Sequence, residues 1–309
     1  MKNVFTEGTL IKGKDLKGYA LCKVLSENTN MQGFQYQMGM NEDIKPLDIE
    51  GFNKAGLYFC LVEDVYLWLH YGIKLAIISI PDDEDVFVDN YGFRTHRMKI
   101  EKVMSFDEVE TWDYLQKNGL DVTACSNISI NWATGRGYFE VVKYLHQSGV
   151  DITIDDNYLV KYASEKGHLE IVKYLHENGS DITAEDNYAV KMAAENGYLD
   201  VVKYLHQNGA DITAEDNFAI GSAAEHGHLE VVKYLHQNGA DITAENDYAV
   251  RFAAGNGYLE IVTYLHENGA DITAVNNHAF RLAKQNEQFE VVKYLQEHGA
   301  ILPTDNEVM

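Results

Sequence analysis

The 309-residue chain has few cysteines, few basic residues and no long hydrophobic run. Its three cysteines, Cys22, Cys60 and Cys125, form no Cys-x-x-Cys pair, so neither a zinc ribbon nor a disulfide framework is indicated. The longest apolar run, Leu75 to Ile80, is too short to span a bilayer, and no apolar stretch after Met1 resembles a signal peptide. These absences predict an intracellular protein that is not secreted.

Positive charge is scarce, with 25 Lys and Arg against 48 Asp and Glu and a formal net charge of −23. Residues 1–108 hold 12 basic and 17 acidic side chains, whereas residues 109–309 hold 13 and 31. A field of this sign repels phosphate backbones and anionic lipid headgroups, so we expect neither nucleic acid nor a membrane as partner. A basic protein surface would be attracted. The simpler interpretation is that the acid only keeps the surface solvated.

Motifs of the common enzyme classes are also missing. The sequence contains no phosphate-binding glycine loop, no His-Glu-x-x-His and no catalytic triad that can be assigned by spacing. We therefore expect no enzyme, no catalytic residues, no cofactor and no metal site.

What the chain does contain is one phrase that returns every 30 residues. Val201 to Thr213 reads Val-Val-Lys-Tyr-Leu-His-Gln-Asn-Gly-Ala-Asp-Ile-Thr, and the same letters recur at Val231 to Thr243. A fixed period of this size predicts stacked supersecondary units, that is, a solenoid. The tyrosine of the phrase falls at Tyr114, Tyr144, Tyr174, Tyr204, Tyr234, Tyr264 and Tyr294.

Each unit is expected to hold two short helices. The first begins after Asp186 and Asn187, whose side-chain oxygens could cap it, and ends at Gly197, which can adopt a positive φ. The second runs from about Leu199 to Asn208. Helices this short cannot bury both faces alone, so each pair must stack on its neighbours.

The same unit carries a family resemblance. Ala193-Ala194-x-x-Gly197-Tyr198-Leu199-Asp200-Val201-Val202, followed by Gly209-Ala210-Asp211-Ile212, resembles the ankyrin repeat. The resemblance implies a mainly α fold, with an ankyrin-type helical solenoid over residues 106–309. One leading helix would precede six helix pairs, and a small α+β domain would occupy residues 1–105. It also implies a protein partner bound on the concave side of the stack.

The chain departs from the ankyrin pattern in two places. The Thr-Pro-Leu-His of the family reads Tyr188-Ala189-Val190-Lys191 in one unit and Phe218-Ala219-Ile220-Gly221 in the next. The unit is also shorter than the usual length of about 33 residues, and the shortening falls between Thr213 and Phe218, where the family places a β-hairpin finger. We expect short fingers, which shifts the binding role onto the first helices.

Two columns of equivalent residues vary where the rest of the unit is constant. They lie four residues apart on one face of the first helix, which the resemblance places in the concave groove. The first column holds Trp132, Tyr162, Met192, Ser222, Phe252 and Leu282, and the second holds Arg136, Lys166, Asn196, His226 and Asn256. Aromatic anchors beside charges are typical of a binding surface. The alternative is that these side chains pack between neighbouring helices.

A histidine recurs on the second helix, at His146, His176, His206, His236 and His266. Neighbouring helices lie roughly 8–10 Å apart, too far for adjacent imidazoles to share a zinc ion at bonds near 2 Å. We interpret this column as half-exposed amphipathic side chains rather than as a metal site or a pH switch.

The first hundred residues follow a different pattern. Strands are expected at Gly33–Met38, Leu57–Leu61, Lys74–Ile80, Val86–Val88 and within Phe93–Ile100, with an amphipathic helix at Glu63–Tyr71. The segments Gly56-Leu57-Tyr58-Phe59-Cys60 and Ile80-Pro81-Asp82-Asp83 resemble the module that precedes ankyrin arrays in mimivirus-type giant viruses.

The same strand order is weakly similar to the core of ADP-ribosyltransferases. That family would need a residue that grips the dinucleotide and a catalytic glutamate, for which only Lys17-Gly18-Tyr19 and Glu101 could stand in. Our preferred hypothesis is a monomeric, non-enzymatic scaffold or adaptor that binds a protein. The alternatives are an ADP-ribosyltransferase-like N-terminal domain, active or degenerate, and a purely structural spacer.

Overall fold

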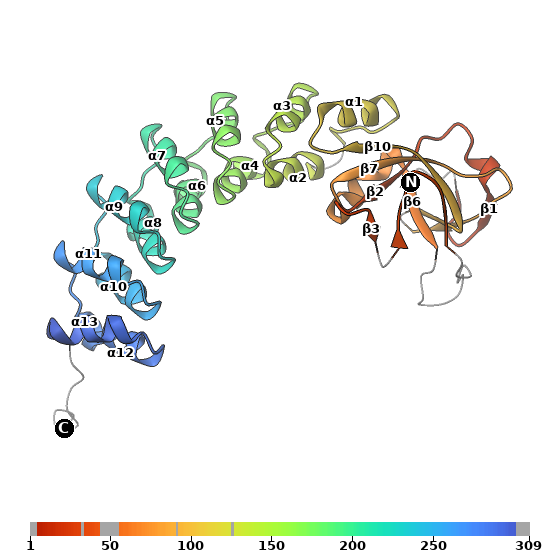
Figure 1. Cartoon of the computed structure of the whole chain (residues 1–309). Coiled ribbons are helices and arrows are strands. Elements are labelled where there is room, and N and C mark those ends of the chain that lie inside the picture. Colours follow the sequence, from red (N-terminus) through yellow and green to blue (C-terminus); the bar gives the residue numbers. More distant parts are fainter. Residues whose placement is uncertain (1–4, 32–33, 44–55, 91, 125–126, 301–309) are drawn as a thin grey trace. The chain divides into compact units, whose positions relative to one another are not determined.

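The computed structural model describes residues 5–31, 34–43, 56–90, 92–124 and 127–300 (Figure 1). By its internal contacts the chain divides into two compact units, Met1–Asp151 and Ile152–Met309. The domain boundary predicted at residues 105 and 106 rests on the repeat period, which is a different criterion, and it stays a prediction.

The first unit contains an eight-stranded sheet in the order β1-β8-β9-β6-β2-β7-β10-β5, and the described pairings are antiparallel. A separate ribbon pairs β3 with β4. The strands are β1 (Leu10–Lys12), β2 (Leu21–Leu25), β3 (Asn30–Met31), β4 (Phe34–Gln35), β5 (Gly39–Glu42), β6 (Leu57–Leu61), β7 (Lys74–Ser79), β8 (Asp85–Asp89), β9 (Gly92–Thr95) and β10 (Arg97–Ser105).

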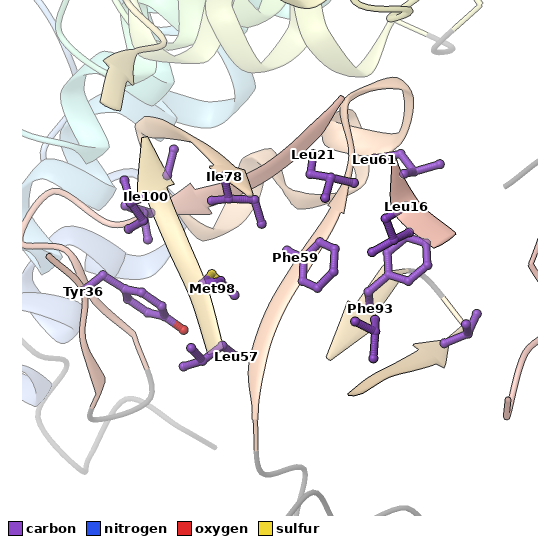
Figure 2. Packing of buried hydrophobic residues seen from close by; sticks show 14 residues of the cluster. Leu16, Leu21, Tyr36, Leu57, Phe59, Leu61, Ile78, Phe93, Met98 and Ile100 are labelled. Carbon is purple, nitrogen blue, oxygen red and sulfur yellow. The ribbon is translucent and has the colours of Figure 1, made fainter. Parts of the chain in front are cut away.

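The core of the sheet is apolar and aromatic. Figure 2 shows Phe59 of β6 and Phe93 of β9 among its buried side chains, and their rings stack with centroids 5.2 Å apart. Strand β2 is buried at all five positions, because the 3-10 helix η2 (Val62–Tyr71) also packs against it. Burial on both sides makes β2 a continuous buried run rather than an alternating one.

Most of the predicted elements of this region are present. Leu57–Leu61 is β6, Lys74–Ile80 contains β7, and Phe93–Ile100 forms two strands that break at His96. The segment Glu63–Tyr71 is helical but 3-10 rather than α. Of the predicted Gly33–Met38 strand, Gly33 lies outside the described residues and only Phe34–Gln35 pairs.

The helical part follows the predicted plan of one leading helix and six pairs. The leading helix is α1 (Val109–Lys117). The pairs are α2 (Ile128–Arg136) with α3 (Phe139–Gln147), α4 (Ile154–Glu165) with α5 (Leu169–Glu177), α6 (Ala184–Glu195) with α7 (Leu199–Gln207), α8 (Ala214–Glu225) with α9 (Leu229–Gln237), α10 (Ala244–Gly255) with α11 (Leu259–Glu267), and α12 (Ala274–Gln285) with α13 (Phe289–Glu297). The fold class, a mainly α repeat stack with a small α+β N-terminal region, is therefore confirmed.

The second unit is a two-layer stack. Helices α4, α6, α8, α10 and α12 pack in one row and α5, α7, α9, α11 and α13 in the other. Figure 1 shows the first row on the inner side of the bend of this unit. Alanines at the contacts of the first row, such as Ala193 and Ala194, are fully buried, and so are Val202 and Leu205 on the second helix. Small side chains let the helices of this row approach closely.

Gly197 ends the first helix of its repeat, as predicted, with a φ of 78°. Packing between repeats also requires glycine at this position, because a Cβ atom at Gly197 would lie 2.4 Å from the ring of His228 in the next repeat. In the last repeat Glu287 occupies this position with a φ of 60°. No ring of a following repeat lies against it among residues 127–300.

Candidate functional site

Each first helix of the second unit is preceded by a left-handed turn. In α6 the residues Glu185, Asp186 and Asn187 have φ values of 52°, 52° and 64°, and the Asn187 amide donates to Thr183 O at 2.9 Å. Asn and Asp tolerate this conformation better than other residues with a Cβ. The regular first helix therefore begins at Tyr188.

The asparagine of this turn joins one repeat to the next. The Asp211 amide donates to Asn187 Oδ1 at 2.8 Å, and the equivalent bonds reach Asn157, Asn217 and Asp247. The expectation that Asn187 caps its own helix is therefore wrong. Its oxygen accepts from the main chain of the following repeat.

The aspartate that donates this amide is itself held in place. The main chain and the hydroxyl of Thr213 both donate to Asp211 Oδ1, at 2.8 and 2.7 Å. The Thr213 hydroxyl and amide lower the pKa of Asp211, because they stabilise the carboxylate. The turn is thus best formed when Asp211 is ionised.

The histidine column bonds along the outer row of helices. His176 Nδ1 lies 2.9 Å from the Tyr204 hydroxyl oxygen, and the same contact joins His206 to Tyr234. Each histidine is half-buried. Within the described residues, no group of three or more His, Cys, Asp or Glu side chains could hold a metal ion.

In the first unit, the predicted site residue Trp132 belongs to an aromatic cluster. Its ring contacts Phe106 at 5.5 Å, Trp112 at 6.2 Å and Tyr138 at 5.4 Å between centroids. Phe106 and Trp112 are fully buried, and Arg136 lies over the Trp132 ring at 5.3 Å. Trp132 is half-buried within this cluster, whereas Arg136 is exposed.

In the second unit, the varied face begins at α4. Tyr162 stacks on Tyr158 at 5.5 Å, and the exposed Lys166 lies over the Tyr162 ring at 5.3 Å. On α6, Met192 is half-buried and Asn196 is exposed, with Asn196 Nδ2 donating to Met192 O. On each of these two helices a half-buried side chain thus lies one turn before an exposed polar one.

The same positions have different surroundings in the next repeats. Ser222 is buried and its hydroxyl donates to Glu195 of the preceding repeat, and His226 is exposed. Phe252 is half-buried and stacks on Tyr248 at 4.1 Å.

Asn256 and Leu282 complete the predicted set. Asn256 Nδ2 donates to Glu225 O at 2.8 Å, so it also links two repeats. Leu282 is half-buried beside Gly255. Of the predicted residues, Ser222 and Asn256 thus make contacts that hold the stack together.

A third column was not part of the predicted site, although two of its residues, Tyr188 and Phe218, depart from the family pattern. Tyr158, Tyr188 and Phe218 are exposed by 41%, 40% and 46%, which is high for side chains of this size. They stand four residues before Tyr162, Met192 and Ser222, so one helical turn relates the two columns. That spacing was the signal that could have added them to the predicted face.

The comparison with protein families bears on the whole helical region. The family model described as ankyrin repeats (3 copies) matches residues 104–186, 130–216, 160–246, 190–276 and 220–307. These matches cover well over half of the chain. The chain belongs to the ankyrin repeat family.

One giant virus encodes several relatives of this ankyrin repeat protein. An uncharacterized protein of Acanthamoeba polyphaga mimivirus is 30% identical over 137 residues, which is 39% of this chain and 92% of the relative. Two putative ankyrin repeat proteins of the same virus are 29% and 26% identical, over 35% and 39% of this chain. The matched region spans 38% and 63% of those two relatives.

The residues considered for an ADP-ribosyltransferase activity make separate contacts in this ankyrin repeat protein. Lys17 pairs with Asp82 at 2.6 Å. Glu101 accepts a hydrogen bond from Ser79 and pairs with Lys99, which together lower its pKa. The described contacts do not join Lys17 to Glu101. Among the described residues, no helix has the length and apolar character needed to cross a membrane.

Proposed function

We propose that this ankyrin repeat protein is a non-enzymatic scaffold or adaptor, which acts as a monomer inside the cell and binds a protein on the first-helix face. Ankyrin repeats generally mediate protein–protein interaction. The proposed surface consists of the two predicted columns in the second unit together with Tyr158, Tyr188 and Phe218.

The observation that carries the proposal is the contrast between the two helices of each repeat. The second helices are almost identical from repeat to repeat and bond to one another through the histidine column. The first helices carry large, partly exposed and varied side chains. A binding surface needs different side chains at equivalent positions, whereas the packing of one repeat on the next needs the same side chains in each repeat.

The proposed partner has a basic surface. Exposed acids recur at the left-handed turns, including Asp156, Asp186 and Asp216. Such a row attracts a positively charged protein and accelerates its association.

The test compares two added charges on the same repeat. Tagged full-length protein would be used to capture proteins from lysate of an amoebal host, and a captured protein would then be purified for a direct binding measurement. Met192→Glu places a carboxylate in the proposed face, and Gln207→Glu adds the same charge at the exposed end of the second helix. Both variants should melt close to the wild type.

We expect Met192→Glu to weaken binding at least about tenfold, since a charge would be buried without a partner, and Gln207→Glu to change it little. Equal binding by both variants would refute the first-helix face. The absence of any discrete protein partner would favour the structural spacer. Transfer of ADP-ribose by the purified protein, lost in Glu101→Ala, would favour the enzymatic alternative.

A further inference from the structure

One position of the first helix holds a cation in most repeats of the second unit. It is occupied by Lys161, Lys191, Arg251 and Arg281, and by Gly221 in the central repeat. Lys161 and Lys191 are only 6% and 3% exposed. A lysine is almost never buried to this extent unless its ammonium is paired.

Each buried lysine pairs with a glutamate in the left-handed turn of the next repeat. Lys161 Nζ lies 2.7 Å from Glu185 Oε1, and Lys191 pairs in the same way with Glu215. The Lys191 ammonium also lies 6.0 Å from the centre of the Tyr188 ring. The stack thus contains its own example of a lysine-binding site, built from a carboxylate and an aromatic ring.

At Gly221 the cation is missing but the rest of that site remains. Glu245 stands 24 residues after Gly221, as Glu215 stands after Lys191, and Phe218 takes the place of Tyr188. In the part of the chain that the structure describes, no cation pairs with the Glu245 carboxylate. A glycine inside a helix also costs about 1 kcal/mol relative to alanine, so the local helix gains nothing from it.

A cavity of about 370 Å³ lies beside Gly221. Its walls include Phe218, Tyr248 and the apolar side chains of Ile220 and Ala249. A volume of this size is at the lower end of the range of small-molecule sites, and it exceeds what one amino-acid side chain requires.

The charge of the cavity wall is entirely negative. Glu215, Asp216, Asp241 and Glu245 line it, and no basic side chain does. Glu215 is neutralised by Lys191, and Asp241 accepts hydrogen bonds from Thr243. Asp216 and Glu245 pair with no cation among the described contacts, and of these two Glu245 alone has the position that Glu215 takes relative to Lys191.

The ion pairs within the stack indicate that a glutamate at this turn position accompanies an ammonium rather than a guanidinium. Where the chain uses Arg251, the equivalent turn position holds Val275 instead of an acid. Arg251 donates to the main-chain oxygen of Glu245 at 2.8 Å and contacts His278 Nδ1 at 3.0 Å. Arginine at this position is thus satisfied by carbonyl and imidazole groups, whereas lysine accompanies glutamate.

We propose that the cavity beside Gly221 binds a lysine side chain of a protein partner, whose ammonium pairs with Glu245 as Lys191 pairs with Glu215. The ring of Phe218 contacts the charged end, and Tyr248 and Ile220 contact the methylene groups. This proposal rests on the proposed function only in that a protein supplies the lysine.

The cavity can be tested without the partner. Nα-acetyl-lysine N-methylamide would be titrated into the full-length protein, and the amide signals of residues 217–221 and 241–249 would be followed by nuclear magnetic resonance. The matched control ligand is the norleucine analogue, which has a chain of similar length without the ammonium. We expect saturable shifts with the lysine compound and shifts at least about tenfold weaker in apparent affinity with the control, since the charge-assisted bond is lost.

Two variants address the pairing with Glu245, and a third, Gly221→Met, is their control. Glu245→Gln alters one exposed side chain and should remove the preference for the lysine compound. Gly221→Lys supplies the cation internally, so it should raise the melting temperature and block the titration. Gly221→Met fills the space without charge and should not gain stability from Glu245.

A Cβ at residue 221 would lie 3.1 Å from Tyr248, so the Tyr248 ring must shift slightly in both Gly221 variants. For this reason Glu245→Gln, which needs no such shift, decides the outcome.

Equal binding of the lysine and norleucine compounds, or equal lysine binding by wild type and Glu245→Gln, would overturn the proposal. So would the absence of saturable shifts in the wild type. A positive titration with no protein partner captured would refute the proposed scaffold function while leaving the lysine site. A captured partner that binds the wild type and Glu245→Gln equally well would refute the lysine site and leave the scaffold function standing.

Discussion

The bond from Asn187 to the next repeat permits a quantitative prediction. In Asn187→Ala the Asp211 amide loses its acceptor, which lies 2.8 Å away. A bond of this kind contributes about 1 kcal/mol net to stability. Alanine must also adopt the positive φ of 64° that asparagine tolerates, which costs roughly 1 kcal/mol more. The free energy of unfolding should therefore fall by about 2 kcal/mol.

Other substitutions separate these two terms. Asn187→Gly accepts the positive φ and loses only the bond, so the loss should be about 1 kcal/mol. Asn187→Asp keeps the acceptor, as Asp247 does in its own repeat, and should change stability least. Asp186→Ala changes an exposed neighbour with a φ of 52° and controls for the backbone term alone.

Urea denaturation would measure the free energies, and hydrogen exchange of the Asp211 amide would report the bond itself. Exchange at Asp211 should accelerate in Asn187→Ala and Asn187→Gly but not in Asp186→Ala. Unchanged protection of the Asp211 amide in Asn187→Ala would contradict the assigned bond, and so would an Asn187→Asp variant as unstable as Asn187→Ala.

Three further predictions follow from burial and backbone geometry. Burial raises the pKa of Asp247 above its ordinary value of 3.8, because the ionised form is less favourable in the folded state. Asp247→Asn should therefore be more stable than the wild type near neutral pH. Thermal melts should show this gain disappearing as the pH falls through the raised pKa. Burial also raises the pKa of the Cys22 thiol, so alkylation followed by mass spectrometry should be slow in the folded protein and fast after denaturation; equal rates would contradict this. Gly197→Ala should lose more stability than Gly209→Ala in chemical denaturation, because both have positive φ but only the first places a Cβ against His228; equal losses would show that the ring moves aside freely.

Much of the repeat architecture could be predicted from the sequence because its signals are local. The limits of the second helix at Leu199 and near Asn208, and the end of the first helix before Gly197, follow from turn residues and apolar spacing within one unit. The strands of the N-terminal region are harder to predict from the sequence. Strand β2 includes Lys23, whose ammonium is buried and donates to Tyr58 O at 2.7 Å, so it lacks the alternation that identifies a strand.

The candidate site was only partly predictable, because a column of equivalent residues does not have equivalent surroundings. Trp132 and Phe252 occupy the same position of the repeat, yet Trp132 lies among Phe106 and Trp112 whereas Phe252 stacks on Tyr248. The repeat period identifies such positions as neighbours along one face. It does not tell which of them are covered by other side chains.

The sequence by itself therefore determined the period, the helices and the family of this protein, since each depends on contacts within a turn or between adjacent helices. Tertiary structure decided how the repeats are joined and where the stack is open. Asn187 and Asp211 are 24 residues apart in the chain and meet only after stacking. The cavity beside Gly221 likewise needs the following repeat, because Glu245, which lines it, takes the position at which Glu215 binds Lys191.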